Sequence, residues 1–225
     1  MKNGIHIRNP TQSLYVNKLM NVNNNIVIAI GPSGTGKTLL AIHVGIQKLL
    51  QKKLYKIILT RPTVSVDEDI GFLPGKIEDK MSPWLRPIFD ILSNYFSKDA
   101  IQQMINDNII EMCPLSLMRG RTFEDSWIIC DEAQNTTSSQ MKMILTRLGK
   151  NSKMVIIGDT EQQDGKFSHN GLMDIIQRLS QQNGIAQNKG IHIVRFSQND
   201  VQRHPVVKYL LKLYDDARQE TSEQT

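Results

Sequence analysis

Cysteine and long apolar segments are both scarce in this sequence. Cys113 and Cys130 are the only cysteines among 225 residues, and neither has a metal-binding neighbour at the spacing of a C-x-x-C motif. Both lie in apolar stretches, which is typical of reduced core thiols in a cytosolic protein. No apolar run approaches the roughly 20 residues that span a bilayer, and the opening residues MKNGIHIRNP lack the apolar core of a signal peptide. We therefore expect a soluble, cytoplasmic protein with no membrane partner.

The net charge and the length of the chain limit the class of partner and the number of domains. The formal net charge is +5, with the basic excess in the first half of the chain, so an anionic partner is only mildly favoured. A length of 225 residues allows one well-buried domain and excludes two full nucleotide-binding folds. We expect a single domain over residues 1–218, followed by a polar, disordered tail over residues 219–225.

A glycine-rich loop follows the first apolar run. Residues 31–38 read GPSGTGKT, the G-x-x-x-x-G-K-[ST] pattern of a phosphate-binding P-loop. Glycines allow left-handed turns and let backbone N–H groups approach phosphates, while the lysine reaches the β/γ-phosphates and the threonine hydroxyl binds Mg²⁺. The predicted nucleotide-binding residues are Gly31, Pro32, Ser33, Gly34, Thr35, Gly36, Lys37 and Thr38.

Acidic and amide side chains follow two later apolar runs. Asp131 ends the run over residues 127–131 and Glu132 follows it, while Asp159 and Gln162 follow the run that ends at Gly158. We expect Asp131 to bind Mg²⁺ together with the P-loop threonine, and Glu132 to orient or deprotonate an attacking water. Because ligands bind at the carboxyl ends of parallel strands, Gln162 is predicted to sense the γ-phosphate, with Asp159 supporting the metal or water network.

Apolar runs alternate with helical patterns along most of the chain. This alternation predicts a doubly wound, mostly parallel α/β sheet with helices on both faces. The expected strands are residues 26–30, 55–60, 109–113, 127–131, 154–158 and 191–196. The expected helices are residues 37–51, 83–96, 100–106, 138–148, 171–179 and 201–218.

Several linked motifs resemble a known family. GPSGTGKT, CDEAQ and GDTEQ resemble the ATPase half of superfamily 1 helicases. With TRP, IGFLPG, WLRPIFD, MRGRTFEDSWIICDEAQNTT, MKMILTRLG and RHPVV, the chain from about residue 10 to 214 resembles the PhoH-like family of phosphate-starvation-inducible ATPases. That resemblance implies a RecA-like P-loop fold, ATP and Mg²⁺ as ligands, and a homo-oligomeric ring, most simply a hexamer. It assigns the phosphate and Mg²⁺ roles to Lys37, Thr38, Asp131, Glu132 and Gln162.

Gln12 is the candidate for reading the base. The segment Asn-Pro-Thr-Gln that ends at Gln12 precedes the first strand as the adenine-reading glutamine motif does in helicase-like ATPases, and a glutamine amide can pair with both N6 and N7 of adenine. The alternative is an exposed amide with no such role. No N-K-x-D guanine-reading motif is present, so ATP is favoured over GTP.

An arginine that neutralises charge on the γ-phosphoryl group in the transition state is also expected. The candidates are Arg119, Arg121, Arg147 and Arg203. We favour Arg203, acting on a neighbouring subunit, because it follows the last strand and is expected to lie away from its own P-loop. A ring would supply the wall of the site that a second RecA-like domain supplies in helicases.

A nucleic-acid partner is a further expectation. A set of cations with one tryptophan around the long insertion could bind single-stranded RNA or DNA by stacking and phosphate contacts; its members are Arg61, Lys76, Lys80, Trp84 and Arg86. The alternative is a core tryptophan among solvated cations. For the whole protein, the alternatives to an ATPase are a nucleotide-gated scaffold with negligible turnover and a small-molecule kinase.

Overall fold

A parallel sheet of six strands forms the centre of the computed structural model, which describes residues 6–62, 82–160, 170–182, 184–203 and 206–207. The strands are β1 (Ile26–Ile30), β2 (Lys56–Thr60), β3 (Ile110–Met112), β4 (Ser126–Cys130), β5 (Lys153–Gly158) and β6 (Ile191–Arg195). Their order in the sheet is β3-β2-β4-β5-β1-β6, and every pair is parallel. The predicted doubly wound α/β fold is confirmed.

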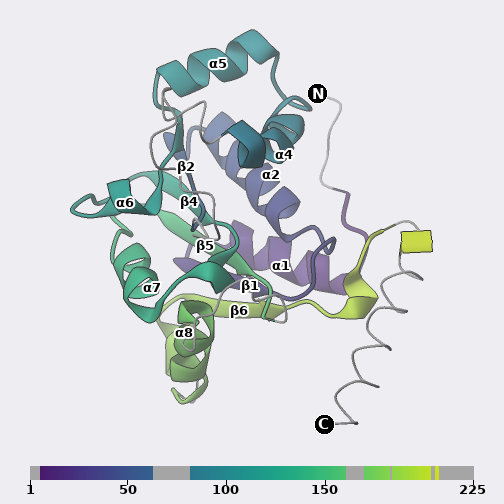
Figure 1. Cartoon of the computed structure of the whole chain (residues 1–225), viewed down its shortest axis with the longest axis vertical. Helices are drawn as coiled ribbons and strands as arrows, with labels where there is room; N and C mark the ends of the chain where they lie inside the picture. The colour runs from purple at the N-terminus through teal and green to yellow at the C-terminus, as the bar shows by residue number, and fades with distance from the viewer. Residues whose placement is uncertain (1–5, 63–81, 161–169, 183, 204–205, 208–225) are drawn as a thin grey trace.

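Helices cover both faces of the sheet. They are α1 (Pro10–Met20), α2 (Lys37–Leu50), α4 (Ser82–Leu92), α5 (Lys98–Asn106), α6 (Leu115–Met118), α7 (Ser138–Leu145), α8 (Gly171–Ser180) and α9 (Ile185–Asn188), with 3-10 turns η1 (Ala133–Asn135) and η2 (Gln198–Asp200). Helices α1, α2 and α4 lie on one side of the sheet, and α6, α7 and α8 lie on the other (Figure 1). The inner strands β1, β2, β4 and β5 are therefore buried on both faces, which explains their nearly continuous apolar sequences.

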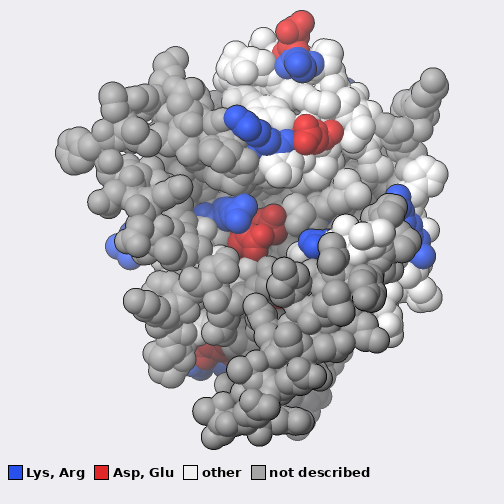
Figure 2. Space-filling view, turned by 45° about the vertical axis from the view of Figure 1, so that its right-hand side comes forward, with Lys and Arg blue, Asp and Glu red and all other residues white. Residues whose placement is uncertain are grey.

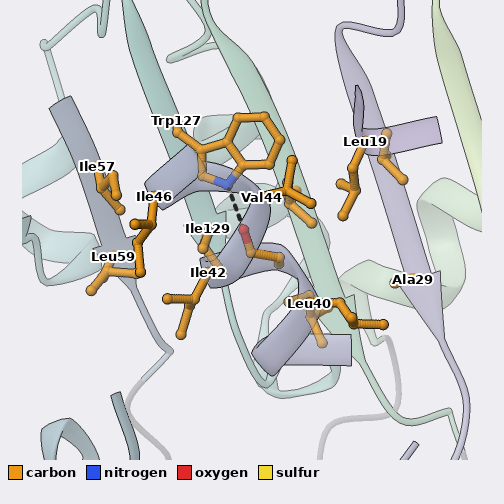
Figure 3. Close-up of a cluster of buried hydrophobic side chains, with 14 of the residues drawn as sticks. Leu19, Ala29, Leu40, Ile42, Val44, Ile46, Ile57, Leu59, Trp127 and Ile129 are labelled. Carbon is orange, nitrogen blue, oxygen red and sulfur yellow. Dashed lines mark hydrogen bonds between the residues drawn. The ribbon is translucent and has the colours of Figure 1, made fainter. Parts of the chain in front are cut away.

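Alternate residues of the inner strands enter two separate cores. In β4, Trp127 and Ile129 pack into the core beneath α1 and α2 (Figure 3). Ile128 and Cys130, on the opposite face of the same strand, pack into the core beneath α7 and α8. This period of two is the ordinary geometry of a strand, and it fixes the register in which the strand ends reach the carboxyl edge of the sheet.

Trp127 ties β4 to the middle of α2. Its indole Nε1–H donates a hydrogen bond to the Ala41 carbonyl at 3.1 Å (Figure 3), so the polar group of this buried ring is satisfied. The ring lies directly over Gly45, where an added Cβ would come within 2.7 Å of Trp127 Cδ1. Glycine at position 45 thus allows the close approach of helix and ring.

Helix α1 is absent from the elements that the sequence predicted. Asn9 caps it by accepting a hydrogen bond from the Gln12 N–H at 2.8 Å, and a proline occupies its first turn, both of which are ordinary signals of a helix start. The expected helix over residues 201–218 is wrong at its beginning, because η2 ends at Asp200 and residues 201–203 are not helical. The expected tail over residues 219–225 lies outside the described residues. No described helix is both long enough and apolar enough to cross a bilayer.

Candidate nucleotide-binding site

A cavity of about 240 Å³ lies at the carboxyl ends of β1, β4 and β5. Its lining comes from the P-loop, the start of α2 and the residues after β4 and β5, namely Ser33, Gly34, Gly36, Lys37, Thr38, Leu39, Asp131, Glu132, Ile157, Gly158 and Asp159. β6 ends at the right of Figure 1. Figure 2 brings this side of the molecule forward and shows basic and acidic side chains of described residues next to one another. The structure therefore brings together the predicted phosphate-binding and acidic residues.

The backbone of the P-loop requires its glycines. Gly31, Gly34 and Gly36 have φ values of 134°, 80° and 87°, a region that residues with a Cβ rarely adopt. At Gly31, an added Cβ would also collide with the Phe196 carbonyl. Gly36 is the N-cap of α2, so the first turn of that helix offers unpaired N–H groups and a favourable dipole to an anion.

Lys37 is folded back onto its own loop. Its Nζ donates hydrogen bonds to the Gly31 carbonyl at 2.6 Å and to the Pro32 carbonyl at 2.7 Å. Burial lowers the pKa of Lys37, and the negative charges of Asp159, Asp131 and Glu132 act against this lowering. A phosphate entering the loop competes with two neutral carbonyls for a largely desolvated ammonium group, and a charged acceptor wins that competition.

We expect Lys37→Ala to weaken ATP binding by about 10- to 100-fold, because a hydrogen bond to a charged group contributes roughly 1.5–3 kcal/mol. Calorimetric titration of the variant with ATP measures this change. Circular dichroism must accompany it, since Lys37 Nζ also holds two loop carbonyls. Lys142→Ala, at an exposed position of α7, is the matched control. Unchanged ATP affinity in a folded Lys37→Ala protein would contradict the phosphate role.

Thr38 and Asp131 meet as the metal prediction requires. The Thr38 hydroxyl donates to the two carboxylate oxygens of Asp131 at 3.1 and 3.3 Å. Burial and the adjacent charge of Glu132 raise the pKa of Asp131. A divalent cation would offset both the burial of the Asp131 charge and its repulsion by Glu132. Mg²⁺ prefers oxygen ligands and is held by one or two carboxylates together with phosphates and water. This hydroxyl and carboxylate fit such an ion, and the described residues contain no three-residue cluster of His, Cys, Asp or Glu that would hold a metal unaided.

Glu132 is held at the mouth of the cavity by an unusual backbone conformation. Its φ is 54°, in the left-handed region that non-glycine residues rarely adopt and that is often found at functional sites. Its carboxylate accepts a hydrogen bond from Gln134 Nε2 at 2.5 Å and lies 3.8 Å from Arg61 Nη2. Arg61, which the sequence placed in a nucleic-acid surface, is thus a neighbour of the predicted catalytic carboxylate.

Gln134 is a site residue that the sequence interpretation did not single out. While its Nε2 binds Glu132, its Oε1 accepts a hydrogen bond from the Asp159 backbone N–H at 3.1 Å. Gln134 therefore joins the ends of β4 and β5. Its position two residues after Glu132 was visible in the sequence, but its bridging role depends on the sharp turn at residue 132.

Arg203 lies on its own P-loop, so the expectation that it lies away from that loop is wrong. Its Nη2 donates to the Ser33 hydroxyl at 2.6 Å, and its Nε would lie 2.6 Å from a Cβ added to Gly34. The cause is the chain after β6, which turns back so that the Gln202 N–H donates to the Gly34 carbonyl at 2.8 Å. The guanidinium is placed to reach phosphates in the same subunit.

The other candidate arginines differ in what they contact. Arg121 forms an ion pair with Glu111 and lies 4.6 Å above the Phe123 ring. Arg147 donates to the Arg121 carbonyl at 2.9 Å and to the Met143 carbonyl at 3.0 Å. Arg119, just after α6, is exposed and forms no ion pair with a described carboxylate. Arg121 and Arg147 are thus occupied within the fold, whereas Arg119 can reach another molecule.

Gln12 is buried, with 4 % of its surface exposed, so the alternative of an exposed amide is wrong. Its Oε1 accepts from the Arg8 N–H at 2.8 Å, and its Nε2 donates to the Thr35 carbonyl at 2.9 Å. Beside it lies a cavity of about 420 Å³ that shares Gly34, Gly36 and Leu39 with the phosphate cavity and also includes Tyr95. The role of Gln12 in reading adenine stays a prediction.

Some predicted residues lie outside the described part of the chain. They are Gln162, Lys76 and Lys80, together with the side chain of Trp84. Arg86 lies exposed on α4. The γ-phosphate role of Gln162 and the nucleic-acid surface therefore stay predictions.

Comparisons with known proteins agree with this geometry. A family model described as "PhoH-like protein" matches residues 4–215. A PhoH-like protein of Bacillus subtilis is 46 % identical over 193 residues, which cover 85 % of this chain and 59 % of that protein. Protein PhoH of Escherichia coli K12 is 36 % identical over 210 residues, which cover 92 % of this chain and 57 % of that protein. The chain thus spans somewhat more than half the length of these relatives.

One solved structure supports the fold alone. It is the Sulfolobus solfataricus SWI2/SNF2 ATPase core in complex with dsDNA, which matches with a TM-score of 0.50 at 15 % identity and covers 86 % of this chain and 46 % of that one. The arrangement of the sheet and its helices is therefore similar to that of this solved structure.

Proposed function

The chain belongs to the PhoH-like protein family and is a P-loop nucleotide-binding protein, and on that premise we propose that it hydrolyses ATP in the presence of Mg²⁺. The observation that carries the proposal is Glu132 beside Asp131 at the phosphate cavity. A protein that only binds nucleotide has no need of a second carboxylate next to the metal-binding one. A general base near an attacking water is what hydrolysis requires.

Each residue at the cavity then has a distinct task. The P-loop N–H groups, Lys37 and Arg203 bind phosphate oxygens, and Thr38 with Asp131 would hold Mg²⁺. That ion, when bound, neutralises charge on the phosphates. Glu132 orients a water and accepts its proton. Gln134 orients the Glu132 carboxylate through a hydrogen bond.

The cavity next to Gln12 is the proposed place of the base. It has a volume of about 420 Å³ and adjoins the P-loop through Gly34 and Gly36. Tyr95 presents an aromatic ring there, and its hydroxyl is hydrogen-bonded to His43 Nε2 at 3.2 Å. Aromatic rings stack on bases of every kind, so selectivity for adenine would come from Gln12.

The active form we propose is a homo-oligomeric ring, with a hexamer as the simplest case. Arg119 is exposed and lies just after α6, in the connection between β3 and β4. An exposed arginine there can enter the site of a neighbouring subunit. Coupling to single-stranded RNA or DNA is proposed as the work that this ATPase performs.

We expect steady-state ATP hydrolysis that depends on Mg²⁺ and that single-stranded RNA or DNA stimulates. EDTA should stop turnover without lowering the melting temperature of the nucleotide-free protein, because the described residues form no metal cage. ATP binding without turnover would instead favour a nucleotide-gated scaffold. A large loss of thermal stability in EDTA would contradict the proposed metal site.

A further inference from the structure

A second cavity lies at the opposite end of the sheet from the P-loop. It has a volume of about 670 Å³ and is formed where β4 and β5 begin and where α1 and α2 end. Its lining consists of Met20, Val22, Asn25, Lys48, Lys53, Leu54, Trp127, Leu148, Gly149, Lys150, Asn151, Ser152 and Lys153. We refer to it as the amino-end cavity. Strands of five or six residues separate it from the phosphate site by roughly 17–20 Å.

The charge of the amino-end cavity is of one sign. Four lysines line it and no acidic residue does. Lys48 and Lys153 are each only 7 % exposed, whereas Lys53 and Lys150 are exposed. None of the four forms an ion pair with a carboxylate of the described residues. A buried ammonium group without a counter-charge is costly, so an anion in this cavity would stabilise the protein.

The two buried lysines already bind backbone carbonyls at the end of α1. Lys153 Nζ donates to the carbonyls of Leu19 and Asn21, each at 2.6 Å, and Lys48 Nζ donates to the Met20 carbonyl at 3.1 Å. Cations are favourable at a helix C-terminus, but carbonyl dipoles do not cancel a full charge. Burial lowers the pKa of Lys153 to about 8, and the nearby charge of Lys48 adds to this lowering.

Part of the lining is apolar. Leu54 and Trp127 are buried, and Met20 and Leu148 are partly exposed. A cavity of 300–1,000 Å³ with apolar walls and a few polar groups is typical of sites for small organic molecules. A bare inorganic ion would leave the apolar part of this surface uncovered.

We propose that the amino-end cavity is a second ligand site, separate from the P-loop, which binds a small phosphorylated organic molecule. The phosphate is held by the lysines, and an aromatic or other apolar group covers the apolar part of the lining, in which Met20 and Leu148 are partly exposed. A phosphate dianion suits a cavity lined by four lysines better than a carboxylate, because it carries more charge and more acceptor atoms. This site requires neither hydrolysis nor a ring. The proposal of a second ligand site is therefore independent of the function proposed above.

The test is calorimetric titration of the full chain with 1-naphthyl phosphate, which combines a phosphate with an aromatic ring. We expect one equivalent to bind, and 1-naphthoate and 1-naphthol to bind at least tenfold more weakly. The double variant Lys53→Gln, Lys150→Gln changes only the exposed lysines and should therefore fold; we expect it to lose at least tenfold in affinity. Lys142→Gln, on the exposed surface of α7, and Lys37→Ala, at the P-loop, should leave the affinity unchanged.

Four results would overturn the site. They are no binding at millimolar 1-naphthyl phosphate, equal affinity for 1-naphthol or 1-naphthoate, unchanged affinity in the double variant, and loss of binding in Lys37→Ala. The last would place the probe at the P-loop, while separate titration with ATP reports on that site independently.

The pH dependence offers a second measurement on the same complex. The charged and titratable groups around the cavity and Lys153 are the basic Lys18, Lys48, Lys53, Lys150 and His192. The carboxylate of Asp125 lies beside the lining, where it accepts a hydrogen bond from Asn151 at 3.0 Å. Because burial lowers the pKa of Lys153 to about 8, this lysine loses its proton between about pH 7 and pH 9, while the phosphate is already a dianion above about pH 7. Affinity should therefore fall severalfold between about pH 7 and pH 9. Constant affinity across this range would place the phosphate away from Lys153.

Discussion

Replacing Glu132 by glutamine is expected to lower the rate of ATP turnover by about 10²–10⁴-fold, the usual contribution of a general base, with ATP affinity within a fewfold of the native value. The amide keeps the size of the side chain but cannot accept the proton of the attacking water. It does not touch the loop that holds the phosphates, since Lys37 and the P-loop N–H groups are unchanged. Single-turnover hydrolysis and calorimetric ATP binding, measured on the same preparation, separate the two effects.

Glu124→Gln is the matched control for this variant. Glu124 is an exposed carboxylate just before β4, at the far end of that strand from Glu132, and its loss should change neither rate nor affinity. Near-normal turnover in Glu132→Gln would show that another group accepts the proton. Because Gln134 orients the Glu132 carboxylate, the protein should first be checked for an unchanged melting temperature.

Replacing Arg119 by alanine is expected to lower turnover by a factor on the order of 10³–10⁵, as does loss of an arginine that stabilises the transferred phosphoryl group. ATP binding should be retained, because the exposed Arg119 is assigned to the site of a neighbouring subunit. Arg203→Ala should behave differently. It removes a guanidinium that contacts its own P-loop through Ser33, so it should weaken ATP binding by about 10- to 100-fold, the contribution of a charged hydrogen bond.

Mixed assemblies make the assignment of Arg119 testable. When Arg119→Ala subunits are mixed with native protein, turnover should fall by more than the fraction of variant subunits, because each variant subunit inactivates the site of its neighbour. Arg178→Ala, which removes an exposed arginine of α8 that pairs with Asp174, is the control. A fully active monomer in sedimentation, or normal turnover by the Arg119→Ala protein alone, would contradict an arginine supplied by a neighbour.

The sheet could be predicted from the sequence because its inner strands are buried on both faces. Each of the four inner strands, β1, β2, β4 and β5, is a short, mostly apolar run, and each of the six predicted runs overlaps an observed strand. The P-loop and the acidic pair after β4 could be predicted for a related reason. Their chemistry depends on residues adjacent in sequence, and the parallel sheet then brings the strand ends to one edge.

Other features depend on contacts between distant parts of the chain. The position of Arg203 follows from the turn after β6, in which the Gln202 N–H donates a hydrogen bond to the Gly34 carbonyl. No local pattern in the sequence indicates this turn. Helix α1 has weak apolar periodicity, and Leu14 in it is half exposed, so the pattern of apolar residues does not indicate a helix there. The amino-end cavity could not be predicted at all, since Lys48 and Lys153 become neighbours only when α2 and β5 have packed.

Helix α1 gives the nucleotide site a dependence on local unfolding. Near the start of the helix, Gln12 holds the Thr35 carbonyl of the P-loop, and at its end two lysines hold the last carbonyls. Segments of a native protein open separately, each with its own free energy. When this helix opens, the P-loop loses the Gln12 contact although the sheet stays intact. We therefore expect the affinity for nucleotide to depend partly on the free energy of opening of the first helix, to which residues far from the phosphates contribute.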